Sequence, residues 1–196
     1  GRDVVWGATW RMVKELADAP RDEVAVVLDA AAGAVAGESF EAQVRAAGSI
    51  LRSHARRGRR AVLVCAGAHT ESVRVSSDDG DWGAALDLLA AAEPDGARPL
   101  ADVVTGEGAA AQALELVVVT ARLEHRLVDR LTQRAQSHRG ASVVFVDTAS
   151  FAARPSRLEP ELLRLQAAGV QIAVVRRGDD LRTALGLRRA AGVARA

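Results

Sequence analysis

Asp29 is the residue of this sequence whose type and position are best suited to chemistry, because it directly follows a run of buried character. The run, residues 23–28 (EVAVVL), is apolar and β-branched, which is typical of a strand covered on both faces of a parallel sheet. A carboxylate at the end of such a strand can serve as the nucleophile of a phosphohydrolase. That chemistry needs a second acid two residues later for the leaving group, and Ala31 stands there instead. A phosphohydrolase using Asp29 is therefore kept as an alternative only.

The turn after Asp29 is a poor match to a nucleotide-binding loop. A dinucleotide-binding fold requires the pattern G-x-G-x-x-G directly after its first strand, so that the backbone can approach a pyrophosphate. Here Gly33 and Gly37 are too sparse, and the Asp29 carboxylate stands where phosphate would lie. A phosphate-binding lysine is also missing, since Lys14 is the single lysine and precedes the first strand. A Rossmann-like nucleotide-binding protein is thus a second alternative.

Nucleophilic catalysis by serine lacks its partners. A hydrolase of this kind needs a nucleophile, a base and a group that orients the base. Ser39 and Ser150 lie near expected strand ends, and the only histidine at a matching strand end is His69. We therefore expect a protein that is not an enzyme and that carries no cofactor.

The composition excludes further classes of protein. Lys and Arg number 26 against 25 Asp and Glu, so the formal net charge is +1 and no field over the whole surface attracts nucleic acid. Five arginines gather between residues 52 and 60, but no aromatic side chains alternate with them, and we expect no nucleic-acid binding. One cysteine excludes a disulfide framework, and we expect a soluble domain because no long apolar run is free of charges.

The elements that must position these residues follow from the periodicity of apolar side chains. Strands are expected over residues 23–28, 60–65, 70–76, 114–120, 142–147 and 171–175. Helices are expected over residues 39–58, 82–89, 100–104, 123–135, 161–168 and 181–187, the first of them capped by Ser39. The alternation predicts an α/β fold with a doubly wound, mainly parallel sheet, helices on both faces and one antiparallel edge strand. Ligands of such a fold lie beyond the carboxyl ends of the strands, here at residues 29–39, 67–69, 120–124 and 147–150.

The N-terminal residues resemble those of a known family. Residues 1–22 are expected to form an N-terminal arm that continues from a preceding region, and residues 23–196 a single domain. Within the arm, residues 5–11 and 12–16 are similar to the W-R-x-T-A-R and L-x-V-R-E-x-E signatures of the bacterial "domain of unknown function 58" family. Residues 39–64 also resemble the first helix and second strand of that family.

The resemblance implies a von Willebrand factor A-like fold, in which Asp29 begins the D-x-S-x-S motif. Competent members carry a metal-ion-dependent adhesion site, where hydroxyls and acids bind a divalent cation through oxygen. This chain keeps Asp29 and Thr120. The other positions of the site are occupied by Ala31, Gly33, Arg98 and Ala121. We therefore expect a degenerate, vestigial site whose divalent-cation binding is lost or weak.

Arg98 stands where the adhesion site would have its threonine, and two interpretations of it are open. The guanidinium could enter the former metal pocket and pair with Asp29, supplying the charge that the ion once gave. Alternatively, Arg98 points to solvent and the pocket has simply lost its metal. The two interpretations differ in whether Asp29 has a cationic partner.

The resemblance also implies a function and a location. It implies a noncatalytic protein–protein interaction domain that works with a MoxR-type AAA+ ATPase and assists the assembly or activation of a partner. The domain would face the cytoplasm, and the full-length protein would be anchored in a membrane. The partner is expected at the strand-end face, at Asp29, Ser39, Arg98, Thr120 and Arg122.

Overall fold

A six-stranded sheet with the order β3-β2-β1-β4-β5-β6 forms the centre of the molecule. It is seen in a computed structural model that describes residues 23–76, 79–156 and 159–186, so the expected arm of residues 1–22, with Trp6 and Trp10, lies outside the described residues. The strands are β1 (Val24–Asp29), β2 (Ala61–Ala66), β3 (Thr70–Val75), β4 (Glu115–Thr120), β5 (Gly140–Val146) and β6 (Gln171–Val175). Neighbouring strands are parallel except β2 and β3, which pair antiparallel. The expected α/β fold with one antiparallel edge strand is confirmed.

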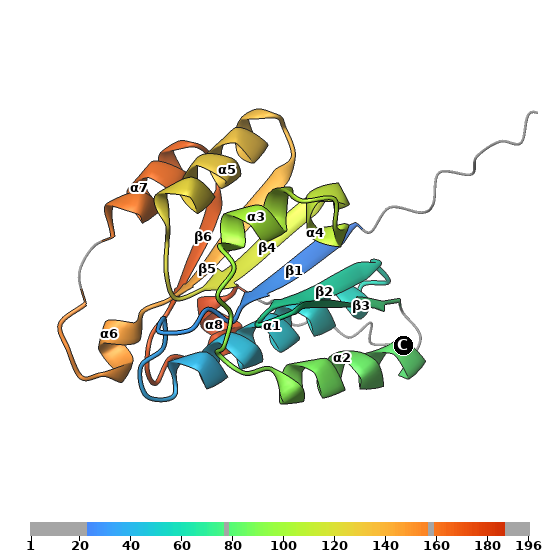
Figure 1. Cartoon of the computed structure of the whole chain (residues 1–196), viewed down its shortest axis with the longest axis horizontal. Helices are drawn as coiled ribbons and strands as arrows, with labels where there is room; N and C mark the ends of the chain where they lie inside the picture. Colours follow the sequence, from blue (N-terminus) through green and yellow to red (C-terminus); the bar gives the residue numbers. More distant parts are fainter. Residues whose placement is uncertain (1–22, 77–78, 157–158, 187–196) are drawn as a thin grey trace, which may run out of the picture.

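Helices cover both faces of the sheet (Figure 1). Helices α1 (Ser39–Ala55), α2 (Asp79–Ala91) and α8 (Leu181–Ala184) pack on one face. The other face is covered by α3 (Leu100–Thr105), α4 (Ala109–Gln112), α5 (His125–Gln136) and α7 (Pro160–Ala167). A short helix, α6 (Thr148–Phe151), follows β5.

The central strand β1 shows why the chain folds in layers. Residues 24–28 of this strand are fully buried, because successive side chains point to opposite faces and both faces are covered. Val26 and Leu28 pack toward α1 and α2, whereas Ala25 and Val27 pack toward the helices of the other layer. The apolar β-branched run that predicts a buried strand is therefore used on both sides.

The connections reverse direction at β1. From β1 the chain moves outward through β2 to β3, and it then returns to pair β4 with the other side of β1. In an open α/β sheet, the crevice beyond the carboxyl ends at such a switch point is the usual ligand position. Leu28 of β1 is paired with Val119 of β4. The next residue on each strand, Asp29 and Thr120, stands at the switch point.

The N-termini of α7 and α8 follow local rules. Asp180 caps α8 by accepting the Thr183 N–H at 2.9 Å, and Pro160 stands in the first turn of α7 as expected. The expectation that Ser39 caps α1 is wrong. Glu38 holds the cap position, and Ser39 is the first helical residue, whose hydroxyl accepts the Ala36 N–H at 2.8 Å. Ser39 therefore ties down the preceding loop. Within the described residues, no helix has both the length and the apolar character needed to cross a bilayer.

Candidate functional site

Asp29 and Thr120 meet at the switch point as a buried hydrogen-bonded pair. Their side chains come from the adjacent strands β1 and β4, and the Thr120 Oγ1 lies 2.6 Å from the Asp29 Oδ2. The other carboxyl oxygen, Oδ1, accepts the backbone N–H of Ala31 at 3.1 Å. Asp29 is 6% exposed and Thr120 is fully buried. The carboxyl group is thus bonded from within the protein at both oxygens.

The Thr120 hydroxyl has more neighbours than it has hydrogens. Its Oγ1 accepts the Arg122 N–H at 3.0 Å and lies 2.8 Å from the Arg122 carbonyl oxygen as well as 2.6 Å from Asp29. A hydroxyl carries one hydrogen, so an ionised Asp29 and the Arg122 carbonyl compete for it. A protonated Asp29 would donate to Thr120 and leave the hydroxyl hydrogen for that carbonyl.

Burial favours the protonated form of this carboxyl. Loss of solvent raises the pKa of Asp29 above its usual value, and Glu124 acts in the same direction. The hydrogen bonds from Thr120 and the Ala31 N–H, together with the Arg122 charge, oppose that rise without cancelling it. The site is therefore poorly suited to a carboxylate nucleophile, which must be ionised and open to its substrate.

Gly96 joins the loop after α2 to the loop after β1. It forms a parallel bridge with Ala31, its N–H donates to the Ala30 oxygen, and its own oxygen accepts the Ala32 N–H, both at 2.8 Å. A Cβ at this position would lie 2.6 Å from the Ala66 carbonyl oxygen and 2.9 Å from that of Ala30. Only glycine fits so close to two backbones. The loop carrying Arg98 is consequently fixed beside the loop that follows Asp29.

The two arginines of the expected site lie at the surface. The Arg98 side chain is exposed, and within the described residues no ion pair joins it to Asp29. The two carboxyl oxygens of Asp29 are hydrogen-bonded to Thr120 and Ala31 instead. The interpretation that Arg98 enters the former metal pocket is therefore not supported by the contacts. Arg122 pairs instead with Glu124, at 2.6 Å between Nη2 and Oε1.

The expected partner-contact residues thus fall into two groups. Asp29, Ser39 and Thr120 are buried, so they hold the loops in place and cannot themselves touch a partner. Arg98 and Arg122 are exposed on those loops. Direct contact would fall to these two guanidinium groups.

The donors at the switch point do not fit a divalent cation. Mg²⁺ or Ca²⁺ takes six or more oxygen ligands. The Asp29 carboxyl and the Thr120 hydroxyl are bonded to each other, while Ala31 offers only a backbone N–H in that contact and Gly33 is exposed with a φ of +78°. Elsewhere in the described residues, no three His, Cys, Asp or Glu side chains gather as a metal site. Loss of cation binding stays a prediction.

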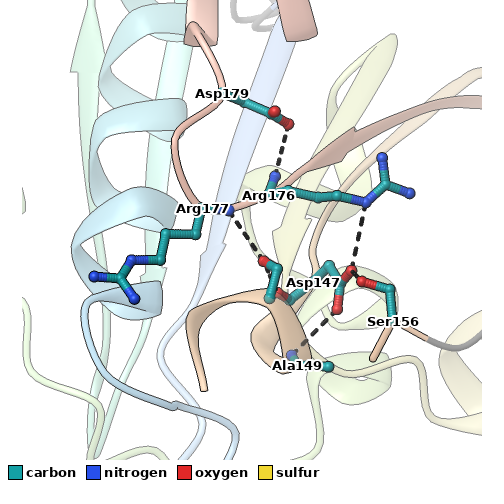
Figure 2. A network of polar contacts seen from close by, with 7 residues as sticks. Asp147, Ala149, Ser156, Arg176, Arg177 and Asp179 are labelled. Carbon is teal, nitrogen blue, oxygen red and sulfur yellow. Dashed lines mark hydrogen bonds and ion pairs between the residues drawn. The ribbon is translucent and has the colours of Figure 1, made fainter. Parts of the chain in front are cut away.

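A second acid, Asp147, is held at the carboxyl end of β5 (Figure 2). It caps α6 by accepting the Ala149 N–H at 3.1 Å, and the Ser156 hydroxyl donates to its other oxygen. The Arg176 Nε lies 3.5 Å from that oxygen, whereas the Arg177 side chain points away from Asp147 (Figure 2). The sequence points to this strand end but not to its arginine partner. The Asp147 carboxyl is 7% exposed and therefore closed to ligands, whereas its partners Ser156 and Arg176 are exposed.

Gln43 on α1 is a buried polar residue that sequence reasoning missed. It is 1% exposed, and neither its amide nitrogen nor its amide oxygen has a hydrogen-bond partner among the described residues. Its position on the apolar side of an amphipathic helix is the only signal in the sequence. A buried amide without partners costs stability.

Cys65 is buried near the end of β2, and His69 is exposed just after that strand. Burial and the Glu71 charge raise the pKa of the Cys65 thiol to about 12, so it stays protonated and unreactive. His69 is exposed at the rim of a cavity of about 170 Å³ between β2 and α2. Neither side chain forms a hydrogen bond or an ion pair with another side chain among the described residues.

The comparisons with known proteins concern the fold. No family model matches the sequence, and no curated protein matches it. The chain is similar to a von Willebrand factor type A structure from Catenulispora acidiphila, with a TM-score of 0.49 and 12% identity over 85% of this chain and 41% of that one. It is also similar to the conserved hypothetical protein BatB from Bacteroides thetaiotaomicron, with a TM-score of 0.52 and 12% identity over 83% and 92% of the two chains. The chain has a von Willebrand factor A-like fold.

Proposed function

We propose that this chain is a noncatalytic protein–protein interaction domain whose binding face is formed by the loops at the carboxyl ends of β1 and β4. The observation that carries the proposal is the Asp29–Thr120 pair, which is buried and internally bonded at the position where this kind of fold places its ligand. A buried pair of this kind holds the loops after β1 and β4 in one conformation. It is a poor place for turnover of a substrate.

The enzymatic alternatives gain little from the same geometry. A phosphohydrolase would need the Asp29 carboxylate ionised and exposed, and burial works against both conditions. A nucleotide would need free backbone N–H groups in the turn after β1. There the Ala31 N–H is bonded to Asp29, and the Ala32 N–H is bonded to Gly96.

Arg98 and Arg122 would make the direct contacts. Both are exposed on loops that Gly96 and Thr120 fix in position. Arginine is well suited to bind carboxylates across an interface, because its planar group donates two parallel hydrogen bonds. The partner surface would accordingly be acidic, and its association would weaken as salt is added.

The identity of the partner is taken from the resemblance to the domain-of-unknown-function 58 family. By that resemblance, the partner is a MoxR-type AAA+ ATPase, and the domain assists the assembly or activation of another protein. The domain would face the cytoplasm as part of a membrane-anchored protein.

The test is co-purification of the full-length protein with the co-expressed MoxR-type ATPase of the same organism. We expect the double variant Arg98→Glu/Arg122→Glu to co-purify with about one tenth of the ATPase that the wild type retains, or less. Reversing two contact charges costs more than the roughly 1.4 kcal/mol that a tenfold change in affinity represents. The matched control is the double variant Arg56→Glu/Arg57→Glu, which reverses the same number of charges on two exposed arginines between α1 and β2, at the opposite edge of the sheet.

Two results would overturn the proposal. One is an equal loss in the control variant, which would mean that binding follows net charge rather than the proposed face. The other is a rise in melting temperature with nucleotides but no retained ATPase, which would favour the Rossmann-like alternative, because a ligand that binds the folded state raises its stability.

A further inference from the structure

A cavity of about 240 Å³ lies at the amino edge of the sheet, the edge opposite to Asp29. Helix α3 and the segment around α4 form one side of it, and the C-terminal end of α5 forms the other. Its floor is apolar and buried, and is made by Val104, Leu116 and Leu131. Its rim carries three guanidinium groups, those of Arg130, Arg134 and Arg139.

Among the described residues, no carboxylate pairs with any of the three guanidinium groups. No acidic residue lines the cavity, and none of the three arginines is in an ion pair within the described residues. Arg134 donates to the carbonyl oxygens of Gly140 and Ala113, the former at 3.0 Å. Arg139 donates to the carbonyl oxygen of Ala113 at 2.7 Å and to that of Ala111 at 2.8 Å. Arg130 has one long contact, 3.4 Å to the Gln133 amide oxygen.

The end of α5 fixes two of these arginines side by side. The Arg139 N–H donates to the Arg134 oxygen at 3.2 Å, and the His138 N–H donates to the Ala135 oxygen at 3.1 Å. Together these bonds are the Schellman arrangement, in which the residue after the helix cap takes a left-handed conformation. That residue is His138, with a φ of 56°. The turn returns Arg139 toward Arg134, so both guanidinium groups reach the same cavity.

Hydrogen-bonding capacity remains on all three arginines. A guanidinium has five N–H donors, and the contacts above use at most two on each residue. Burial and the neighbouring Arg139 charge lower the pKa of Arg134 to about 10, so Arg134 stays charged at neutral pH but is crowded by a like charge. An anion in the cavity would relieve that crowding.

We propose that this cavity binds a small phosphate monoester, with its phosphoryl group on the arginine rim and a compact apolar body on the floor. Several convergent guanidinium groups suit a tetrahedral dianion, because each can offer paired N–H donors to its oxygens. The volume is below the range of pockets that hold drug-sized ligands, so a dinucleotide would not fit. This site is independent of the interaction face at the other edge.

The test is calorimetric titration of the chain at physiological ionic strength, where weak long-range attraction is screened. The probes are phenyl phosphate, inorganic phosphate and phenol, which carry both parts of the proposed ligand, the anion alone and the apolar body alone. Arg130→Gln is the variant of choice, because its exposed side chain makes a single long hydrogen bond and its loss leaves the fold intact. The matched control is Arg126→Gln on the same helix, whose guanidinium is paired with Asp102 at 3.0 Å.

We expect saturable binding of phenyl phosphate, weaker binding of inorganic phosphate and none of phenol. Arg130→Gln should weaken phenyl phosphate about tenfold, the loss expected for one charge-assisted hydrogen bond, while Arg126→Gln should leave its Kd unchanged. No saturable binding to the wild-type chain, or an equal loss in both variants, would overturn the proposal. So would binding to vesicles containing phosphatidic acid without binding to phenyl phosphate, because the ligand would then be a lipid surface.

Discussion

At the carboxyl edge of the sheet the Asp29 carboxyl is bonded by two donors within 3.1 Å and is almost completely buried, whereas at the amino edge three guanidinium groups surround a cavity that no carboxylate lines. The two edges belong to the same strands, since β4 ends at Thr120 and Leu116 near its start lines the cavity. At the carboxyl edge, the Asp29 carboxyl group has hydrogen-bond partners within the protein at both of its oxygens. The amino edge keeps three guanidinium charges whose partners, in the part of the chain that the structure describes, are neutral carbonyl and amide groups.

The difference teaches that a position in the fold and a capacity to bind a ligand are separate properties. Doubly wound sheets place ligands at the carboxyl edge because strand ends and helix N-termini converge there. In this chain the Asp29–Thr120 pair locks the loops at that edge, whereas at the opposite edge three guanidinium groups around one cavity keep unused N–H donors. If the proposed cavity binds its ligand, charge that lacks a carboxylate partner will have been a better guide to it than topology.

The largest effect is expected from adding a side chain at Gly96. A Cβ there would lie 2.6 Å from the Ala66 oxygen, so Gly96→Ala must displace backbone at the carboxyl edge. We expect the free energy of unfolding to fall by about 3 kcal/mol, as for overpacking without a flexible neighbour. Urea denaturation measures it. Gly83→Ala in α2 meets open space, and it should instead stabilise the protein by about 1 kcal/mol. Equal results for the two variants would mean that the loops at this edge are not held together by Gly96.

Removing the hydroxyl of Thr120 should have the next largest effect. In Thr120→Val the buried Asp29 oxygen loses its donor and the Arg122 N–H loses its acceptor. We expect a loss of about 2 kcal/mol in the free energy of unfolding at pH 7, the cost of an unsatisfied buried polar group. Chemical denaturation of Thr70→Val, on the exposed edge strand, provides the reference and should differ little from the wild type. A neutral Thr120→Val would show that the carboxyl edge is open to water.

A smaller, stabilising effect is expected at the amino edge. His138 adopts a left-handed conformation that a side chain makes unfavourable, and glycine has no such penalty. His138→Gly should therefore raise the free energy of unfolding by about 1 kcal/mol, and the melting temperature with it. Phenyl phosphate binding should be unchanged, because the turn that aligns Arg134 and Arg139 is kept. A loss of stability would mean that the His138 side chain has a role in the turn.

The pH dependence should distinguish the two edges by its sign. At the amino edge, burial lowers the pKa of His54 below 6.5, and the Arg59 and Arg57 charges add to that, against Glu115 and Glu23. The unfolded chain then binds more protons, so stability is complete above pH 6.5 and falls as the pH drops through the lower folded pKa. His54→Asn, whose amide oxygen can accept from Arg59 in place of Nδ1, should remove this fall in denaturation experiments between pH 7.5 and 5.

The counterpart at the carboxyl edge is Asp29→Asn. The pKa of Asp29 is raised, so between pH 3.8 and its higher folded pKa the folded chain binds more protons than the unfolded chain. The stability that this residue contributes therefore declines as the pH rises through that range. The Asn variant should lack the decline. If both variants changed the pH dependence of stability in the same direction, one of the two pKa shifts would have the wrong sign.

The sheet was predictable from the sequence because its strands are short, apolar and β-branched. Residues 171–175 match β6 at both ends, and the exposed alternation in residues 70–76 marks the antiparallel edge. Helices α4 and α6 were not predicted, because four residues show no helical period, whereas the equally short α8 was expected as a longer helix after Asp180. Ser39 was misplaced by one residue because Glu38 caps α1 without a side-chain bond.

The sites were less predictable than the fold. Asp29 and Thr120 were placed at one strand-end face by topology, but their hydrogen bond depends on burial, which spacing does not give. The cavity at the amino edge was missed because its arginines look like ordinary surface charges on α5. The spacing of Arg130 and Arg134, four residues apart and facing one side, was a usable signal. The turn that brings in Arg139 depends on a left-handed histidine, which no common rule anticipates.

The hydrogen bond between Thr120 and Asp29 joins residues 91 positions apart in the chain. It cannot form until β4 has paired with β1, and closing so long a loop costs entropy before any contact repays it. The contacts of β1 with β2, and of β2 with β3, span far shorter stretches. We therefore expect the switch point to be among the last parts of the sheet to assemble during folding. Any partner that recognises the loops around it would distinguish finished chains from nascent ones.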